Sequence, residues 1–334
     1  MKRSTLLGSV IGMFLLIMDS RCATQSAADA LDLCLKTVIP SLFPMFVLSG
    51  FLVGTLQGNG GKILSLLERW VGLPTGGGML FLLGIVGGFP VGAQCIAQAV
   101  EAGSLSQSDG EKMLGFCNNC SPAFLFGIAG SVLASPHEAV YLFLIQLETA
   151  LLIARFTYFH KSSDVRISAK SIFLPEAVNR AIRSMCTVCA WVVLAGVVTG
   201  FLRRWIFPLL PVPAPHILTG LLEITGGVLG LAALPEVKIR FVLCTGFVCF
   251  GGLSVWLQIH GLASPKGLST DCCCRQKCTQ CLLGILIASG IVLIGPMALS
   301  MPVFLLLIRK KRLEKPVRNV YNGSHKGGYA NVVP

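Results

Sequence analysis

The sequence predicts an all-α polytopic membrane protein made of two repeats, inverted relative to each other, that contain broken and re-entrant helices. Hydrophobic residues make up 54% of its 334 residues and charged residues 13%, and the mean hydropathy is +0.76. A typical soluble domain is about 25% charged, so this chain lacks the polar surface of a soluble globule of its size. Several apolar stretches approach the ~20 residues that a spanning helix needs. In both halves of the chain, such stretches are interrupted by glycine, proline and polar residues.

The net charge of +12 does not indicate nucleic-acid binding, because the basic residues fall at the ends of apolar runs. Lys2 and Arg3 precede the first run, a basic stretch at 161–170 follows a middle one, and six basic residues follow the last one between 309 and 318. Cytoplasmic loops of membrane proteins carry an excess of Lys and Arg. The region 19–32, expected to be a loop, holds three Asp and one Arg, which places it on the opposite side. We therefore expect both termini in the cytoplasm and an even number of crossings.

The first apolar run, Ser4–Met18, is expected to be an uncleaved membrane helix. Its basic start and short apolar stretch are also typical of a signal peptide, but Ser20–Ala23 is a poor match to a cleavage site. A helix over 31–56 should follow, interrupted at Pro40 and Pro44, because proline lacks an N–H donor and clashes with the preceding turn.

A re-entrant helical hairpin is expected next. Lys62–Trp70 has the pattern of an amphipathic helix that lies at the membrane interface. Gly76–Gly87 is too short to cross a membrane and ends at Gly88–Pro90. Val91–Val100 then continues as a second half-helix.

A second break follows the hairpin. Ser108 and Glu111 have the spacing of a capping box, which predicts a helix start. This helix should reach Cys117 and stop at the two asparagines that follow it. Pro122 should open the next half-helix, which is expected to end near Leu133.

The second half of the chain repeats this order of features. A regular span over His137–Tyr158 and a basic linker close the first half. The elements expected after them are an amphipathic approach at 176–183, a span over Met185–Phe201, a proline-rich loop over 208–215, a helix over Ile217–Leu234 broken at Glu223, a helix over Lys238–Phe250 broken at Gly251, and a last span over Leu282–Ile308.

These features divide the chain into two repeats and indicate a transporter. Irregular backbone is tolerated at membrane depth only where it is buried in protein or lines a cavity. Paired Gly/Pro-interrupted segments in the two halves are the best sequence pointer to a transporter's binding site. The expected regions are a membrane helix and loop at 1–30, a first repeat at 31–160, a basic cytoplasmic linker at 161–184, a second repeat at 185–308, and a basic cytoplasmic tail at 309–334.

The breaks suit a small anionic solute. A half-helix that begins after a break presents unpaired N–H groups and a partial positive charge, and carboxylates bind there without Arg or Lys. The alternative for the glycines is close helix packing, and for the amides it is hydrogen bonding between helices. The candidate substrate-binding residues are Gly88, Phe89, Pro90, Val91, Gly92, Asn118, Asn119, Ser121, Pro122, Thr225, Gly226, Gly227, Gly251, Gly252, Ser254 and Gln258.

Glu223 is the candidate coupling or gating residue. An intramembrane carboxylate is a functional hypothesis by default, because burial of its charge is costly. Glu223 abuts a helix break, where it is placed either to bind a coupling proton or cation or to serve as a partner for buried N–H groups. Glu148 lies in a regular helix, which favours a structural role. The chain contains neither an HExxH nor a GxSxG motif and its histidines are scattered, so we do not expect an enzyme.

Fourteen cysteines include five in the ten residues 272–281. This cluster lacks the two well-separated CxxC pairs of a zinc site. Acylation beside the membrane is another interpretation. We expect reduced cysteines without a function of their own, no metal and no cofactor, because closely packed disulfides need an oxidising compartment.

Five motifs in order resemble those of the YlbJ-type sporulation integral membrane proteins, within the wider nucleoside-recognition, or Gate domain, group. The resemblance covers roughly residues 30 to 308 and lies in the combination, since no single motif is specific. The cysteine-rich segment is a departure from the family pattern. The motifs are Pro40–Pro44, Gly88–Ala93, Asn118–Phe124, Leu222–Gly227 and Gly251–Gln258.

The resemblance implies transport of dipicolinic acid across the outer forespore membrane of the mother cell during sporulation. Related Gate domains occur in nucleoside transporters and in ferrous-iron permeases. Two alternatives stay open: a transporter of nucleosides or other small solutes, and a non-transporting membrane factor that spore cortex assembly needs. The expected partners are a small anion, the lipid bilayer and a coupling proton or cation, without nucleic acid.

Overall fold

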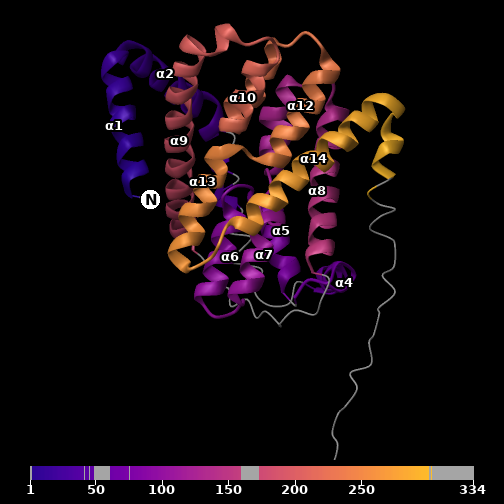
Figure 1. Cartoon of the computed structure of the whole chain (residues 1–334). Coiled ribbons are helices and arrows are strands. Elements are labelled where there is room, and N and C mark those ends of the chain that lie inside the picture. The colour runs from indigo at the N-terminus through magenta and orange to yellow at the C-terminus, as the bar shows by residue number, and fades with distance from the viewer. Residues whose placement is uncertain are drawn as a thin grey trace, which may run out of the picture.

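The protein is an all-helical bundle (Figure 1), as the sequence predicts. The computed structural model describes residues 2–40, 42–44, 46–48, 61–74, 76–158, 173–300 and 302. These residues form helices joined by turns, without a strand among them. The expected basic loop at 161–170, the end of the helix over 31–56, and the basic tail lie outside the described residues.

The first helix, α1 (Lys2–Met18), confirms the expected helix at the N-terminus. The expected loop over 19–32 is wrong, because α2 (Ser20–Leu33) occupies it and meets the preceding helix at 96°. Asp19 caps this helix by accepting a hydrogen bond from the Cys22 N–H. The other carboxylate oxygen of Asp19 forms an ion pair with Arg204 at 2.7 Å, which ties the bend to a distant helix.

The chain is helical through Pro40 and again over 42–44. Residues 41 and 45 lie outside the described residues, so the expected interruptions at Pro40 and Pro44 stay predictions. The π-helical turn η1 (Cys34–Val38) lies before Pro40, where the Ile39 N–H donates to the Cys34 carbonyl. Such a local change of hydrogen-bond register accommodates the N–H that proline lacks.

The expected helical hairpin is confirmed. Helix α4 (Gly61–Val71) precedes it, and α5 (Gly77–Gly87) and α6 (Val91–Glu101) pack against each other across the turn Gly88–Pro90. The Glu68 carboxylate of α4 accepts hydrogen bonds from two N–H groups at the start of α5, at 2.9 and 3.0 Å. The amphipathic helix thus caps the hairpin.

Helix α7 (Gln107–Phe116) ends where the sequence predicts but begins from a different cap. Ser106 has the extended backbone of an N-cap, and its hydroxyl accepts from the Asp109 N–H at 3.1 Å. Ser108, the expected cap, lies inside the first turn. The half-helix from Pro122 then runs through the π turns of η2 (Phe124–Ala129) and the 3₁₀ turn η3 (Gly130–Val132).

Helix α8 (Pro136–Thr157) is the expected regular span. The expected separation between an amphipathic approach and the following span is wrong, because α9 (Leu174–Trp205) is one helix of 32 residues. No glycine or proline lies between residues 176 and 195, so nothing in the sequence ends the helix there. The expected boundary after residue 184 falls inside it.

The second half contains both expected breaks. After η4 (Phe207–Leu209), α10 (Ala214–Leu222) ends at Glu223, and α11 (Ile224–Gly230) and η5 (Leu231–Ala233) follow. Helix α12 (Val237–Phe250) ends at Gly251, and α13 (Gly252–Ala263) and η6 (Ser264–Lys266) follow.

The last long helix begins earlier in the sequence than expected. Helix α14 (Asp271–Ile294) includes the cysteine-rich segment, which was expected to lie outside the span over Leu282–Ile308. The segment lacks glycine and proline, so the helix extends through it. The helix ends at Gly295, whose φ of 77° is left-handed, and η7 (Pro296–Leu299) follows.

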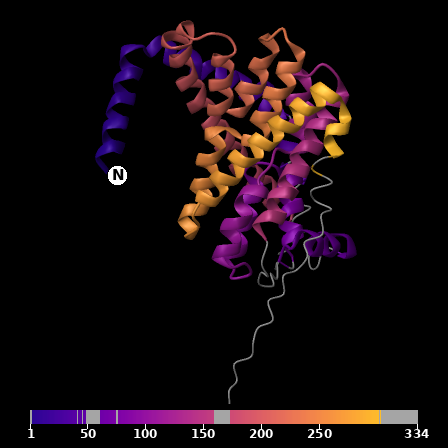
Figure 2. The ribbon, with the colours of Figure 1, turned by 45° about the vertical axis from the view of Figure 1, so that its right-hand side comes forward.

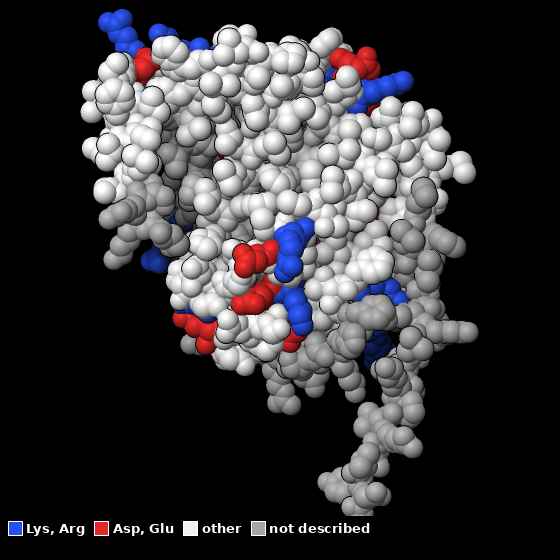
Figure 3. All heavy atoms as spheres, in the orientation of Figure 1, with Lys and Arg blue, Asp and Glu red and all other residues white. Residues whose placement is uncertain are grey.

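The bundle has the lengths and surface of a membrane protein. Four segments of the described chain are apolar and long enough to cross a membrane, or five if the bent pair α1–α2 is one span. On the face shown in Figure 3, charged side chains gather at the upper edge and in the lower half, with an uncharged band between them. The expected even number of crossings and cytoplasmic termini stay predictions.

Broken helices of the two halves lie at different heights in the bundle. Figures 1 and 2 show α5, α6 and α7 in its lower part and α10 and α12 in its upper part. Helix α14 packs against α7 and α8 of the first half and α12 of the second, and α13 packs against α6. Helix breaks from both halves therefore come together, while their inverted symmetry stays a prediction.

Candidate functional site

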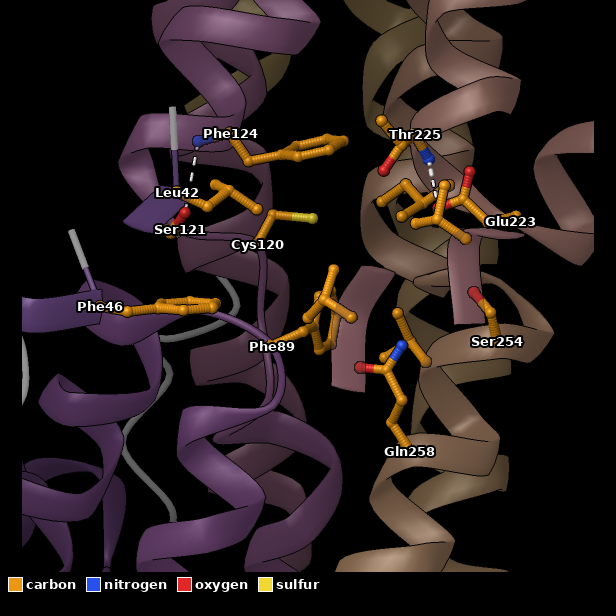
Figure 4. Close-up of a pocket in the computed structure, with 14 residues that line it drawn as sticks. Leu42, Phe46, Phe89, Cys120, Ser121, Phe124, Glu223, Thr225, Ser254 and Gln258 are labelled. Atoms are coloured by element: carbon orange, nitrogen blue, oxygen red, sulfur yellow. Dashed lines mark hydrogen bonds between the residues drawn. The ribbon is translucent and has the colours of Figure 1, made fainter. Parts of the chain in front are cut away.

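A cavity lies between the two halves of the chain (Figure 4). The space between its lining atoms measures about 480 Å³ including a part open to the surroundings, and about 40 Å³ of it can hold the centre of a water molecule. Figure 4 shows first-half residues along one side and second-half residues along the other. The site is therefore shared between the expected repeats.

The first-half wall comes from the two breaks that the sequence predicts. Phe89 lies in the turn between α5 and α6, and Cys120 and Ser121 lie between α7 and the half-helix after it. Gly88 makes their contact possible, because its φ is 72° and a Cβ on it would lie 2.7 Å from the Ser121 Cβ. The two first-half breaks are thus packed directly against each other.

The second-half wall comes from the break at Glu223 and from the start of α13. Thr225, Ser254 and Gln258 line the cavity together with Glu223. Gly251 has a φ of 87°, and a Cβ there would lie 3.1 Å from the Phe89 ring. This glycine therefore marks the point where breaks from the two halves touch.

Glu223 uses both carboxylate oxygens to cap α11. Oε1 accepts from the Thr225 N–H at 2.8 Å and Oε2 from the Gly226 N–H at 2.6 Å. The side chain is buried, and it is an N-cap as well as a cavity residue. Glu223 is therefore a partner for buried N–H groups, the second of the two roles that the sequence offered for it.

Asn118 plays the same part at α6. Its Oδ1 accepts from the Ala93 N–H at 2.7 Å, and its Nδ2 donates to the Leu114 carbonyl. At the break between α7 and the half-helix from Pro122, the Phe124 N–H donates to the Ser121 hydroxyl at 3.3 Å. Asn118 is fully buried and does not line the cavity, so it fastens the start of the hairpin's second half-helix to α7.

Gln258 is a cavity residue whose side-chain oxygen has no hydrogen-bond partner among the described residues. Its side chain is 5% exposed, and its Oε1 accepts no hydrogen bond from any described residue. Figure 4 shows its amide directed toward the space beside Phe89. A buried acceptor without a donor is unfavourable, so this oxygen is placed to accept a hydrogen bond from a solute or water.

The rest of the cavity wall is aromatic and aliphatic. Phe46, Phe89 and Phe124 line it together with Val188 and Val192 of α9. Aromatic faces of this kind suit a flat ring, which stacks or meets them edge-on. No Lys or Arg is among the described residues that line the cavity.

The candidate residues from the sequence thus separate into two groups. Phe89, Ser121 and Thr225 line the cavity, as do Ser254, Gln258 and the coupling candidate Glu223. The others lie behind or beside the wall without lining it: Gly88, Pro90, Val91, Gly92, Asn118, Asn119, Pro122, Gly226, Gly227, Gly251 and Gly252. Their role as substrate-binding residues stays a prediction.

Lys277 was not among the candidates predicted from the sequence, and it lies in α14 with 0% of its surface exposed. A signal for this was present, because Cys273, Gln276, Lys277, Gln280 and Gly284 follow the three- and four-residue spacing of one helix face. The five cysteines of this segment suggested thiol chemistry, although the spacing of its buried residues is helical.

The described residues hold no group of three or more His, Cys, Asp or Glu side chains arranged to bind a metal ion. The cysteines of the segment 272–281 are free thiols in the structure, and only Cys273 of them is buried. They lie along the first turns of α14. Acylation of the exposed members stays an interpretation.

Fold and cavity define a class: a polytopic helical membrane protein with a cavity formed where broken helices meet. The chain is similar to the sporulation integral membrane protein YlbJ of Bacillus subtilis strain 168, with 27% identity over 151 residues. The match covers 41% of this chain and 37% of that protein, which supports the resemblance found in the motifs. No protein-family model and no solved structure matches the chain.

Proposed function

We propose that the protein is a transporter that moves a small, flat, anionic metabolite across a membrane during sporulation. Dipicolinic acid, which its family resemblance implies, is the first candidate cargo. One observation carries the proposal: helix breaks from both halves line a single cavity. Broken helices from two repeats that meet at one site are typical of secondary transporters. The similarity to a sporulation integral membrane protein is the reason to place this transport in sporulation.

A nucleoside is the second candidate cargo. Glu223 and the free Gln258 oxygen are both hydrogen-bond acceptors, and no described Lys or Arg lines the cavity. Such a lining also suits a neutral solute with N–H and O–H donors. The aromatic wall accommodates a nucleobase as readily as a pyridine ring.

The test measures dipicolinate in sporulating cells, separately in the mother cell and the forespore. A deletion is compared with strains that express the wild type, Gln258→Leu in the cavity, or Gln25→Leu on an exposed part of α2. Each variant's level in the membrane is checked. We expect the deletion and Gln258→Leu to leave dipicolinate in the mother cell, and Gln25→Leu to behave as wild type.

The other outcomes identify the alternatives. Normal dipicolinate delivery in the deletion excludes this cargo, and nucleoside uptake into proteoliposomes becomes the next assay. A spore cortex defect in the deletion that Gln258→Leu fully repairs indicates a non-transporting assembly factor. We propose that the solute crosses the membrane without enzymatic conversion.

A further inference from the structure

Lys277 is a buried cation held by neutral groups. Its Nζ donates to the Gln280 Oε1 at 2.7 Å and to the Asn119 Oδ1 at 3.4 Å. The Gln280 Nε2 also donates to the Asn119 Oδ1, at 3.0 Å, and to the Gln146 carbonyl, at 3.3 Å. These contacts hold the two amide oxygens toward the ammonium group.

No described carboxylate balances this charge. The ion pairs of the described chain, Lys36–Asp32, Arg180–Glu176, Arg204–Asp19 and Lys266–Glu101, do not include Lys277. A buried charge without a counter-charge is costly, and inside a membrane protein such a residue marks a functional site by default. Among the described residues, Lys277 therefore has no anionic group that pairs with its ammonium.

One aromatic ring separates Lys277 from the cavity. The Nζ lies 5.2 Å from the centre of the Phe89 ring, and Phe89 itself lines the cavity. On the chain, Asn119 directly precedes Cys120 and Ser121, which line the same cavity. Lys277 therefore lies directly behind the wall, and its third N–H is left for the aromatic face after its two amide contacts.

Phe89 is well placed to move. It lies in the turn between α5 and α6, outside both helices, and is half-buried. A change of its rotamer breaks no helical hydrogen bond.

We propose that Lys277 is the anion-binding residue of this cavity, and that Phe89 covers it when no solute is bound. A carboxylate of the solute replaces the ring and pairs with the ammonium, with Asn119 and Gln280 holding the lysine in place. This inference rests on the proposed transport function and deepens it. It explains how a cavity without a Lys or Arg in its described wall takes an acid.

The test compares two ligands of one shape on the purified full-length protein. Dipicolinate carries two carboxylates, and pyridine-2,6-dicarboxamide carries neutral amides on the same ring. Binding is measured by ligand-induced thermal stabilisation and by calorimetry, and flux is measured in proteoliposomes. The variants are Lys277→Gln, Lys277→Met and Lys277→Arg, with Lys238→Gln as the matched control on an exposed turn of α12.

We expect wild type and Lys238→Gln to bind dipicolinate more tightly than the diamide. Lys277→Gln and Lys277→Met should weaken dipicolinate binding about tenfold or more, because they remove a charge-assisted hydrogen bond, and should leave diamide binding unchanged. Lys277→Arg keeps the charge and should retain the preference for the acid.

Other outcomes overturn the proposal. In the wild type, which needs no variant to fold, equal binding of the two ligands or no binding of either contradicts it. So does an equal loss of both ligands in Lys277→Gln at an unchanged melting temperature. Binding that depends on Lys277 without any flux above protein-free liposomes supports the anion site and refutes the transport function.

Discussion

At the scale of single residues, the polar side chains around the cavity are divided between holding the backbone and meeting a solute. Glu223 and Asn118 accept hydrogen bonds from N–H groups at helix starts, whereas Gln258 has an acceptor without a partner. Type alone does not separate these roles, because every one is a polar residue beside a helix break. Distances to backbone atoms do separate them.

Glu223→Gln should destabilise the fold as well as affect transport. A glutamine keeps one acceptor oxygen, but its amide group meets the second N–H, so one hydrogen bond to α11 is lost. The expected cost is about 1–2 kcal/mol, seen as a lower thermal unfolding midpoint of the purified protein. Glu236→Gln is the control, because Glu236 is exposed and its side chain makes no cap bond at the start of α12.

An unchanged midpoint in Glu223→Gln contradicts the capping role. Lost flux with an unchanged midpoint leaves coupling or gating as the main role of this carboxylate. A lower midpoint with wild-type flux leaves only the structural role.

At the scale of elements, the sequence predicted breaks better than helix lengths. Gly88–Pro90 and Gly251 end helices for local reasons, since a glycine with positive φ ends a helix and a proline inside one removes a backbone hydrogen bond. The start of α14 was missed because the cysteine run was interpreted by its chemistry, although its spacing is helical. The π turn before Pro40 depends on tertiary context that no local pattern reports.

Gly92→Ala should disrupt the packing of α6 on α7. A Cβ on Gly92 would lie 2.2 Å from the Cys117 carbonyl oxygen, so the helices must separate. We expect a loss of about 1–3 kcal/mol, measured as a lower unfolding midpoint in detergent. Gly261→Ala in α13 is the matched control, because nothing lies within 4 Å of its Cβ position.

The control should stabilise the protein slightly, by about 0.5–1 kcal/mol, because alanine is a better helix former than glycine. If the two variants lower the midpoint equally, the close approach of α6 and α7 is not what requires Gly92.

At the scale of the whole molecule, the cavity depends on both halves, and no segment contains it alone. The sequence predicted which breaks form it, because each break has its own Gly, Pro or polar signal. Which breaks touch was beyond the sequence. That information lies in packing between distant elements, such as Phe89 against Gly251, or Lys277 of α14 behind the first-half turn.

A double-mutant cycle across the cavity tests this shared site. Ser121 belongs to the first half and Gln258 to the second, and both line the cavity. If one solute contacts both, the effects of Ser121→Ala and Gln258→Ala on its binding should be non-additive, with a coupling of about 0.5 kcal/mol or more. The control cycle pairs Gln258→Ala with Ser300→Ala, an exposed residue after η7, and should be additive. Calorimetry with dipicolinate and with a nucleoside measures both cycles. Coupling with only one ligand identifies the solute that spans the halves, and additivity with both means that neither occupies the cavity as proposed.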